Sequence, residues 1–514
     1  MGSPFFFLER FLPRKSPALT THLRTYVASD IIVNTMNPSL DRRAFVKAIS
    51  AAGVSAAISA HPARANETTK PSGGAGTRHR YALVGVGVRS GLYQGAIEGK
   101  YKDHAELAGI CDRNVGRLEL ARLKSGNAGV TPPRAYLAED FETMLAETKA
   151  QTVIVTTMDS MHDDYIVRAM EAGCDVITEK PMTTTAEKCQ RILDAVKRTG
   201  KTCRVTFNYR YSPPRTQIKD LLMSGEIGDV LSVDFHWMLN TRHGADYFRR
   251  WHRRKENSGG LMIHKATHHF DLINWWLGAM PVSVFATGKR EFYTPTMAKR
   301  FGLSGAHERC LTCPEKDKCG FYFDLAGDAY LKALYLDNEK HDNYHRDQCV
   351  WREDHDIEDT MNVLVRYDNN VTLAYSLNAF NAWEGYTAVL NGTKGRIEQT
   401  TVESAAGELL PKGVKTLIIP LRGAARSIDA WAGTGGHGGG DTVLLDDLFL
   451  PNPPPDKYVR AADHRAGAAS ILIGVAANEC FKSKQLVMIS DLVRGLEPPD
   501  MAPMPSRDGS LPMP

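Results

Sequence analysis

The feature that most constrains this chain of 514 residues is a strand, a glycine turn and a helix in direct succession. Residues 81–84 (Tyr-Ala-Leu-Val) are apolar and typical of a strand, and the turn Gly85-Val-Gly87-Val-Arg-Ser90-Gly91 follows at once. Gly85 permits a tight turn, and Gly87 lets the backbone approach a pyrophosphate at a helix N-terminus. Ser90 stands where a third glycine is usual. The pattern predicts a dinucleotide-binding turn, with candidate contacts at Gly85, Gly87, Val88, Arg89 and Ser90.

Further strands and helices alternate after this turn. Residues 106–111, 152–157 and 175–178 form apolar runs separated by helical patterns, which predicts a doubly wound parallel sheet across residues 79–205. Asp112 follows the second strand, where an acid accepts hydrogen bonds from ribose hydroxyls and favours NAD. Arg113 comes next and suits a 2′-phosphate, so NADP stays open.

After residue 205 the pattern changes to alternating segments at residues 230–238, 360–367, 371–377 and 386–390. Such alternation predicts a mainly antiparallel sheet with one open face. The expected fold is therefore an α/β Rossmann domain followed by an α+β domain with an open sheet. The predicted divisions are a leader, signal peptide and linker at 1–78, a nucleotide-binding domain at 79–205, a substrate and oligomerisation domain at 206–497 with a cysteine-rich insertion near 300–350, and a proline-rich tail at 498–514.

The leader has the layout of an export signal. Arg42-Arg43 precede a small apolar stretch at residues 48–60 and an Ala63-Arg64-Ala65 cleavage pattern, which together resemble a twin-arginine signal and predict a periplasmic protein. The alternative is a basic leader without function, which would leave the protein in the cytoplasm. A net charge of +4 without a basic stripe argues against nucleic-acid binding. No apolar run after residue 80 reaches the roughly 18 residues that span a bilayer.

The strand at residues 175–178 ends in Glu179-Lys180-Pro181, and His162 opens the preceding helix. This arrangement resembles the Gfo/Idh/MocA family, which includes glucose-fructose oxidoreductase and inositol dehydrogenase, and the resemblance runs from about residue 80 to about residue 490. It implies that Lys180 lies beside the nicotinamide and the reacting carbinol, where a cation stabilises a developing alkoxide. Further cofactor contacts expected on this basis are Thr156, Thr157, His162, Glu179, Lys180 and Asn208.

The segment from Gly259 to Gly278 reads as one helix that ends at Gly278. On one helix, His264, His268 and Asp271 would share a face. The resemblance implies that His268 transfers the hydroxyl proton and that Asp271 is a second acid able to orient a ring nitrogen. His264 stands where the family usually has Asp. The alternatives for this histidine pair are a metal site and buried histidines with only a structural role.

Further substrate contacts are expected from two other segments. Residues 436–441 (Gly-His-Gly-Gly-Gly-Asp) resemble a loop of sugar-acting relatives, although a flexible linker would have the same composition. Arg210 matches a polar position that lines the cleft in the family. The predicted substrate contacts are Arg210, Tyr211, His264, His268 and His437.

Four cysteines are clustered in the insertion, in the pattern Cys310-x2-Cys313-x5-Cys319 with Cys349 downstream. Structural zinc is one interpretation, with Cys349 or His307 as the fourth ligand. Disulfides are nearly as well supported, because an exported protein meets an oxidising environment. Reduced thiols and an iron–sulfur cluster are further alternatives.

Three functions follow from these observations. The leading one is an NAD(P)-dependent oxidoreductase acting on a sugar, sugar derivative or cyclitol, with Lys180 polarising the oxygen and His268 moving the proton. The second is redox-neutral, an NAD-dependent glycosidase or keto-sugar lyase. The third is a non-catalytic NAD-binding regulator, against which Lys180 and His268 both argue. The open sheet also predicts a homo-oligomer.

Overall fold

A parallel sheet begins the described part of the chain, which comprises residues 78–404 and 407–505 of a computed structural model. Its strand order is β3-β2-β1-β4-β5-β6, with all neighbours parallel. The strands are β1 (His79–Val84), β2 (Ala105–Cys111), β3 (Arg134–Tyr136), β4 (Thr152–Val155), β5 (Asp175–Thr178) and β6 (Cys203–Val205). This is the predicted Rossmann sheet. The arginine pair, the cleavage pattern and the end of the tail lie outside the described residues.

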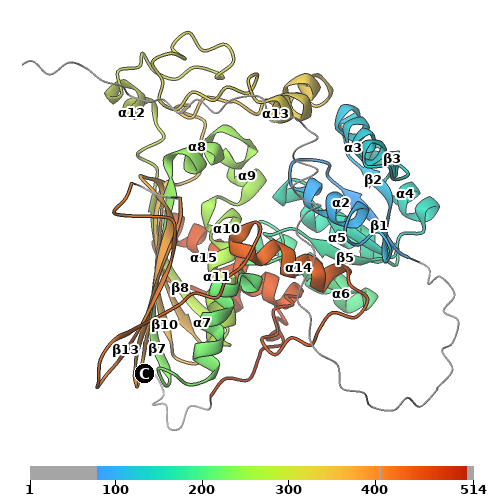
Figure 1. Cartoon of the computed structure of the whole chain (residues 1–514). Coiled ribbons are helices and arrows are strands. Elements are labelled where there is room, and N and C mark those ends of the chain that lie inside the picture. Colours follow the sequence, from blue (N-terminus) through green and yellow to red (C-terminus); the bar gives the residue numbers. More distant parts are fainter. Residues whose placement is uncertain (1–77, 405–406, 506–514) are drawn as a thin grey trace, which may run out of the picture. The chain divides into compact units, whose positions relative to one another are not determined.

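Helices connect these strands in the expected alternation (Figure 1). They are α2 (Ser90–Glu98), α3 (Val115–Asn127), α4 (Phe141–Thr148), α5 (His162–Glu171) and α6 (Ala186–Thr199), with the short 3-10 helices η1 (Ala138–Asp140) and η2 (Asp159–Met161). Every residue of β4 is buried, as expected for a central parallel strand covered on both faces. The carboxyl ends of β1, β2, β4 and β5 therefore meet at one edge, where this class of sheet binds ligands.

A second, mixed sheet follows, with the order β14-β13-β12-β11-β7-β10-β9-β8-β15 within the described residues. Its strands are β7 (Val230–Asn240), β8 (Pro281–Lys289), β9 (Thr360–Tyr367), β10 (Thr372–Asn381), β11 (Glu384–Gly392), β12 (Gly395–Ser404), β13 (Gly413–Pro420), β14 (Arg426–Ile428) and β15 (Val487–Met488). All neighbours are antiparallel except β10 and β7. Buried and exposed residues alternate along β9, which confirms the prediction of one open face.

The remaining helices belong to the second half of the chain. They are α7 (Pro213–Met223), α8 (Thr241–Arg249), α9 (Lys255–Ser258), α10 (Leu261–His264), α11 (Thr267–Leu277), α12 (Pro295–Arg300), α13 (Ala329–Leu334), α14 (Gly440–Phe449) and α15 (His464–Ser483), with 3-10 helices η3 (Asn208–Tyr211), η4 (Trp251–Arg253), η5 (Leu336–His341), η6 (His437–Gly439) and η7 (Ile489–Asp491). The prediction of one helix before Gly278 is wrong. The segment is two helices, α10 and α11, separated at Lys265 and Ala266, and Gly278 ends the second in a left-handed conformation.

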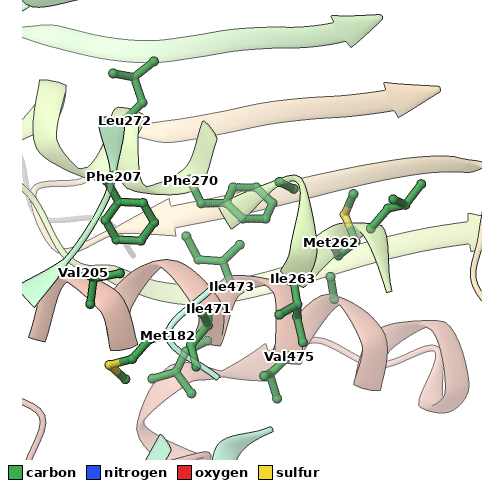
Figure 2. Packing of buried hydrophobic residues seen from close by; sticks show 14 of the residues in the cluster. Met182, Val205, Phe207, Met262, Ile263, Phe270, Leu272, Ile471, Ile473 and Val475 are labelled. Atoms are coloured by element: carbon green, nitrogen blue, oxygen red, sulfur yellow. The ribbon is translucent and has the colours of Figure 1, made fainter. Parts of the chain in front are cut away.

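Helix α15 packs against residues from both halves of the chain (Figure 2). Its apolar side chains lie among Met182, Val205 and Phe207 of the first half and Met262 and Ile263 of α10. Gly474 makes the closest approach, because a Cβ there would lie 2.4 Å from the carbonyl oxygen of Met262. Only glycine allows this spacing, so Gly474 sets how closely α10 can pack against α15. The predicted domain boundary near residue 205 stays a prediction.

Between β8 and β9 lies a long insertion (residues 290–359), which contains α12, α13, η5 and the clustered cysteines. In Figure 1 it runs above the second sheet and brings α13 beside α3 of the first sheet. The insertion therefore belongs to the surroundings of the nucleotide-binding edge as well as to the second half of the chain.

Candidate active site

The glycine turn is held tightly against the end of β4. Gly85 has a φ of +88°, and a Cβ there would lie 2.7 Å from the carbonyl carbon of Thr156. The Thr156 hydroxyl donates to the Gly85 carbonyl at 2.6 Å. The Ser90 hydroxyl donates to the Gly87 carbonyl at 2.7 Å and is buried. Ser90 thus stabilises the turn from behind and does not line the cavity, whereas Gly87, Val88 and Arg89 do.

Asp112 lies at the carboxyl end of β2 and is already extensively hydrogen-bonded. Its Oδ2 accepts from the Val86 amide at 2.6 Å, and its Oδ1 accepts from the Asn114 amide at 2.8 Å and from Arg117 at 3.1 Å. These contacts fix the carboxylate at the position that the sequence predicts for ribose recognition. Arg113 also lines the cavity.

Glu179 ends β5 and is buried under the glycine turn. Its carboxylate forms an ion pair with Arg89 and accepts from the Tyr93 hydroxyl at 2.6 Å. Burial opposes the charged form, but Arg89 and Tyr93 still hold the pKa of Glu179 below its ordinary value. Glu179 therefore remains an anion, and its ion pair with Arg89 joins the glycine turn to the end of β5, where Lys180 follows.

Lys180 lies in the cavity between the two sheets. Its Nζ donates to the backbone carbonyl of His264 at 3.2 Å, which connects the two halves of the chain. Burial lowers the pKa of Lys180 to about 8, although Asp159 and Glu179 partly offset the effect. The side chain is therefore a cation at neutral pH that titrates just above it.

His264 has an acidic partner that the sequence analysis missed. Its Nδ1 lies 2.5 Å from Oδ2 of Asp159, which follows β4. Burial lowers the pKa of His264 and raises that of Asp159, so neither group favours its charged form in isolation. Asp159 comes just after the carboxyl end of a parallel strand, and that position was the available signal.

His268 lies on α11 and stacks on Tyr209, with ring centroids 4.4 Å apart. Its Nδ1 is buried and has no hydrogen-bond partner among the described residues. Burial, together with nearby Lys180, lowers the pKa of His268, so the ring is neutral at pH 7 and able to accept a proton. The His437 ring is 6.3 Å away, and its Nδ1 lies 2.8 Å from Oδ2 of Asp441.

The expected roles of Asp271 and Arg210 need correction. The two residues form a buried bidentate ion pair, with Arg210 donating to the Asp271 carboxylate at 2.7 and 2.6 Å. Neither lines the cavity. Asp271 is therefore bonded to Arg210 and lies away from the cavity that His264 and His268 line. The Tyr211 hydroxyl also points elsewhere and donates to Asp447 at 2.6 Å.

Other predicted cofactor contacts lie close to the turn. His162 is buried and has its ring nitrogens 2.8 Å from the Pro181 carbonyl and 3.2 Å from the Thr157 carbonyl. The Asn208 side-chain amide donates to Asp441 at 2.7 Å, and its side-chain Oδ1 is buried without a partner among the described residues. His162, Asn208, Thr156 and Thr157 all line the same cavity.

This cavity of about 720 Å³ lies between the glycine turn and the second sheet. Several polar lining residues were not predicted, among them Asp159, His243, Tyr247, Arg250, Lys265, Tyr335 and Asp342. His243 Nδ1 lies 2.7 Å from Glu384, and its Nε2 lies 3.1 Å from the Tyr247 hydroxyl. In addition to Lys180 and His268, the cavity is therefore lined by a second group able to transfer protons, formed by His243 and Tyr247 with Glu384 behind them.

The interpretation of the clustered cysteines as a zinc site is not supported. Cys310, Cys313, Cys319 and Cys349 line one small cavity with His307, but they are free thiols. No group of three or more ligating side chains within residues 78–404 and 407–505 is arranged to hold a metal, which also applies to the His264 and His268 pair. Burial raises the pKa of Cys310 and Cys349, which opposes the thiolate that zinc requires.

The fold and the cavity define an α/β protein with a nucleotide-binding Rossmann domain and a second sheet that closes the site. The chain belongs to the Gfo/Idh/MocA oxidoreductase family. Residues 79–207 match the family's NAD-binding Rossmann fold, and residues 219–489 match its C-terminal alpha/beta domain. Within the described residues, no helix is both long and apolar enough to cross a membrane.

Several known proteins are similar to this chain. YteT of Bacillus subtilis (strain 168) is 38% identical over 401 residues, which cover 76% of this chain and 93% of YteT. The scyllo-inositol 2-dehydrogenase (NAD(+)) of the same organism is 28% identical over 41% of this chain and 57% of its own. The structure of the WlbA dehydrogenase from Bordetella pertussis with NADH and UDP-GlcNAcA has a TM-score of 0.54 and 19% identity, over 80% of this chain and 99% of that one.

Proposed function

We propose that this chain is an NAD-dependent oxidoreductase that acts on a hydroxyl group of a sugar, a sugar derivative or a cyclitol. The observation that carries the proposal is the convergence of Lys180, His264 and His268 in the cavity that also contains the glycine turn. Similarity to an inositol dehydrogenase supports the substrate class. Retention of both Lys180 and His268 in this cavity argues against a non-catalytic regulator.

The residues that line the cavity suit a bound dinucleotide. Gly85 and Gly87 give the backbone approach that a pyrophosphate needs, and the unpartnered side-chain Oδ1 of Asn208 is a buried acceptor in a residue that lines the same cavity as Lys180. Asp112 would accept hydrogen bonds from the ribose hydroxyls of the cofactor. Bound NAD would supply the hydride acceptor for oxidation of the carbinol carbon.

The side chains of the protein then have separate tasks. The Lys180 ammonium stabilises negative charge that develops on the substrate oxygen, and its partial burial strengthens this interaction. Neutral His268 accepts the hydroxyl proton. Its stacking on Tyr209 fixes the plane of the ring before the substrate binds. The His264 and Asp159 pair holds the carbonyl that Lys180 contacts.

The test is NADH formation with a panel of sugars, sugar acids and cyclitols, followed by Lys180→Ala and His268→Ala on the best substrate. Each variant should lose about 10²–10⁴-fold in kcat with little change in NADH binding, because general acid–base contributions have that size. Lys100→Ala and His236→Ala serve as controls, since both residues lie outside the cavity. Full activity in either active-site variant would overturn the mechanism.

A redox-neutral reaction is the second candidate, and the additional His243, Tyr247 and Glu384 group favours it. Transient oxidation of one hydroxyl would acidify the neighbouring C–H bond, and such a group is suited to remove that proton while the leaving group departs from the carbon beyond it. Water would then add across the resulting double bond, and return of the hydride would restore the hydroxyl. Glycosides with a chromogenic leaving group distinguish the two reactions. Release of that group at catalytic NAD, without accumulating NADH, would replace the dehydrogenase assignment.

We also propose export through the twin-arginine route, on the basis of Arg42-Arg43 and the cleavage pattern before Asn66. Replacement of both arginines by lysine should retain the uncut protein in the cytoplasm of a bacterial host. N-terminal sequencing of the wild-type protein should find Asn66 or a near neighbour. Wild-type protein that keeps its leader and stays in the cytoplasm would contradict the proposal.

The open face of the second sheet is the surface we propose for a homo-oligomer. Leu364 and Phe285 are paired across β9 and β8 and are 57% and 38% exposed. Apolar side chains gathered on one face favour association. Light scattering should report more than one copy, and Leu364→Glu should shift the protein toward a single copy.

A further inference from the structure

The insertion reaches the nucleotide end of the cavity at several points. The Tyr335 hydroxyl accepts from the Val88 amide in the glycine turn at 3.3 Å. The Asn114 side chain donates to the Asn338 carbonyl at 2.9 Å. A Cβ at Gly116 would lie 1.8 Å from Oδ1 of Asn338, so only glycine in α3 allows η5 to lie so close. The segment from Tyr335 to Asp342 is therefore a wall of the nucleotide site.

Asp342 ends this wall and is joined to Asp112 through one guanidinium. The same Arg117 nitrogen lies 3.1 Å from Asp112 Oδ1 and 2.5 Å from Asp342 Oδ2. The Asp342 side chain is only 3% exposed. A second carboxylate is thus buried beside the acid that we expect at the adenosine ribose, although it lies 230 positions further along the chain.

Asp342 also engages the second arginine. Arg113 donates to the Asp342 backbone carbonyl at 2.8 Å and has its Nε 3.9 Å from the Asp342 carboxylate. Arginine is the side chain best suited to a phosphate, because its fork of donors matches the oxygens. Here Arg117 is buried between Asp112 and Asp342, and Arg113 is directed toward Asp342, so a 2′-phosphate received by Arg113 would lie near the Asp342 carboxylate.

We propose that Asp342 is a second determinant of cofactor specificity and excludes NADP. A 2′-phosphate carries a charge of about −2 at neutral pH and would enter a site with two carboxylates. Like charges at short range disfavour binding strongly where the surroundings are poorly hydrated. The inference rests on the proposed NAD-dependent function and extends it, since the insertion and not only the Rossmann domain then selects the cofactor.

Binding of NADH and NADPH to the full chain, measured by nucleotide fluorescence and by calorimetry, tests this proposal without any substrate. Asp342→Asn keeps the size and the backbone carbonyl but removes the charge. We expect NADPH to bind this variant about 10- to 100-fold more tightly than it binds the wild-type protein, with NADH changed by less than about threefold. Asp337→Asn is the matched control, because Asp337 lies in η5 of the same wall but is half exposed and pairs with Lys332.

The outcomes separate the inference from the function on which it rests. Tight NADH binding with an unchanged NADPH affinity in Asp342→Asn would overturn the inference alone. Failure of the wild-type protein to bind either nucleotide would overturn both. Asp342→Ser gives a second measurement if Asp342→Asn unfolds, because it also removes the charge and should likewise tighten NADPH binding. An unchanged NADPH affinity in a folded Asp342→Ser protein would also overturn the inference.

Discussion

His264 and Asp159 are in contact across the cavity, with Nδ1 of the histidine 2.5 Å from a carboxylate oxygen of the aspartate. Asp159 follows β4 of the first sheet, whereas His264 ends α10 in the second half of the chain. The resemblance to the family predicts an aspartate at position 264, and here Asp159 supplies a carboxylate next to that position. The acid is thus present in this site but comes from a different element.

This relationship predicts how the site responds to the residue that is usual in the family. His264→Asp would place two carboxylates together, and one of them would have to take up a proton or move away. We expect kcat to fall by about 10²-fold or more while NADH still binds. The double variant His264→Asp with Asp159→Asn should recover at least about tenfold of that loss. Undiminished kcat in the single variant would show that the contact has no part in catalysis.

The pH dependence of kcat should report Lys180. Burial lowers its pKa to about 8, so the ammonium is present below that pH and is lost as the pH rises through it. Because the charged form stabilises the developing alkoxide, kcat for alcohol oxidation should decline above about pH 8. Lys180→Arg should lack this decline, since arginine stays charged. An increase in kcat through pH 8 would indicate that neutral Lys180 acts as a base.

Asp271 should matter for stability more than for chemistry. It forms a buried ion pair with Arg210, and removal of one partner leaves the other charge uncompensated. Asp271→Asn should lower the free energy of unfolding by about 3–5 kcal/mol, as measured by urea titration. Its kcat per folded molecule should stay within about threefold of the wild-type value. Asp220→Asn is the control, because Asp220 pairs with the exposed Lys457. A normal free energy of unfolding with a large loss of kcat would restore a catalytic role.

Removal of metal should leave the insertion intact. The clustered cysteines are free thiols, and no group of three or more ligands within the described ranges is arranged for a metal. We therefore expect an unchanged Tm after treatment with a strong chelator, and no stoichiometric zinc by elemental analysis. One zinc per chain that disappears in Cys310→Ser would contradict this expectation.

The sequence was most informative where structure depends on neighbours in the chain. The apolar strands, the glycine turn and the alternation in β9 are set by local spacing, and all of them are present as predicted. Gly278 was also identified correctly as a helix end, because a left-handed residue after a helix favours glycine.

The errors arose where a contact joins distant segments. The interruption at Lys265 and Ala266 separates His264 from the helix that carries His268 and Asp271, and it leaves no local signal. Asp342 meets Arg117 across 225 positions, and no periodicity marks such a partner. Long-range ion pairs depend on how the insertion is packed, which spacing along the chain does not specify.

The tight approach of Gly474 to Met262 has a consequence for the interpretation of random mutants. Any larger side chain there would push α10 away from α15, and the His264 carbonyl that receives Lys180 would move with it. A selection for activity would therefore mark Gly474 as intolerant, although it lies in a different helix and its nearest neighbours in α10 are Met262 and Ile263. In this protein, a map of mutational sensitivity would extend along α15 and would overstate the size of the substrate-contacting surface.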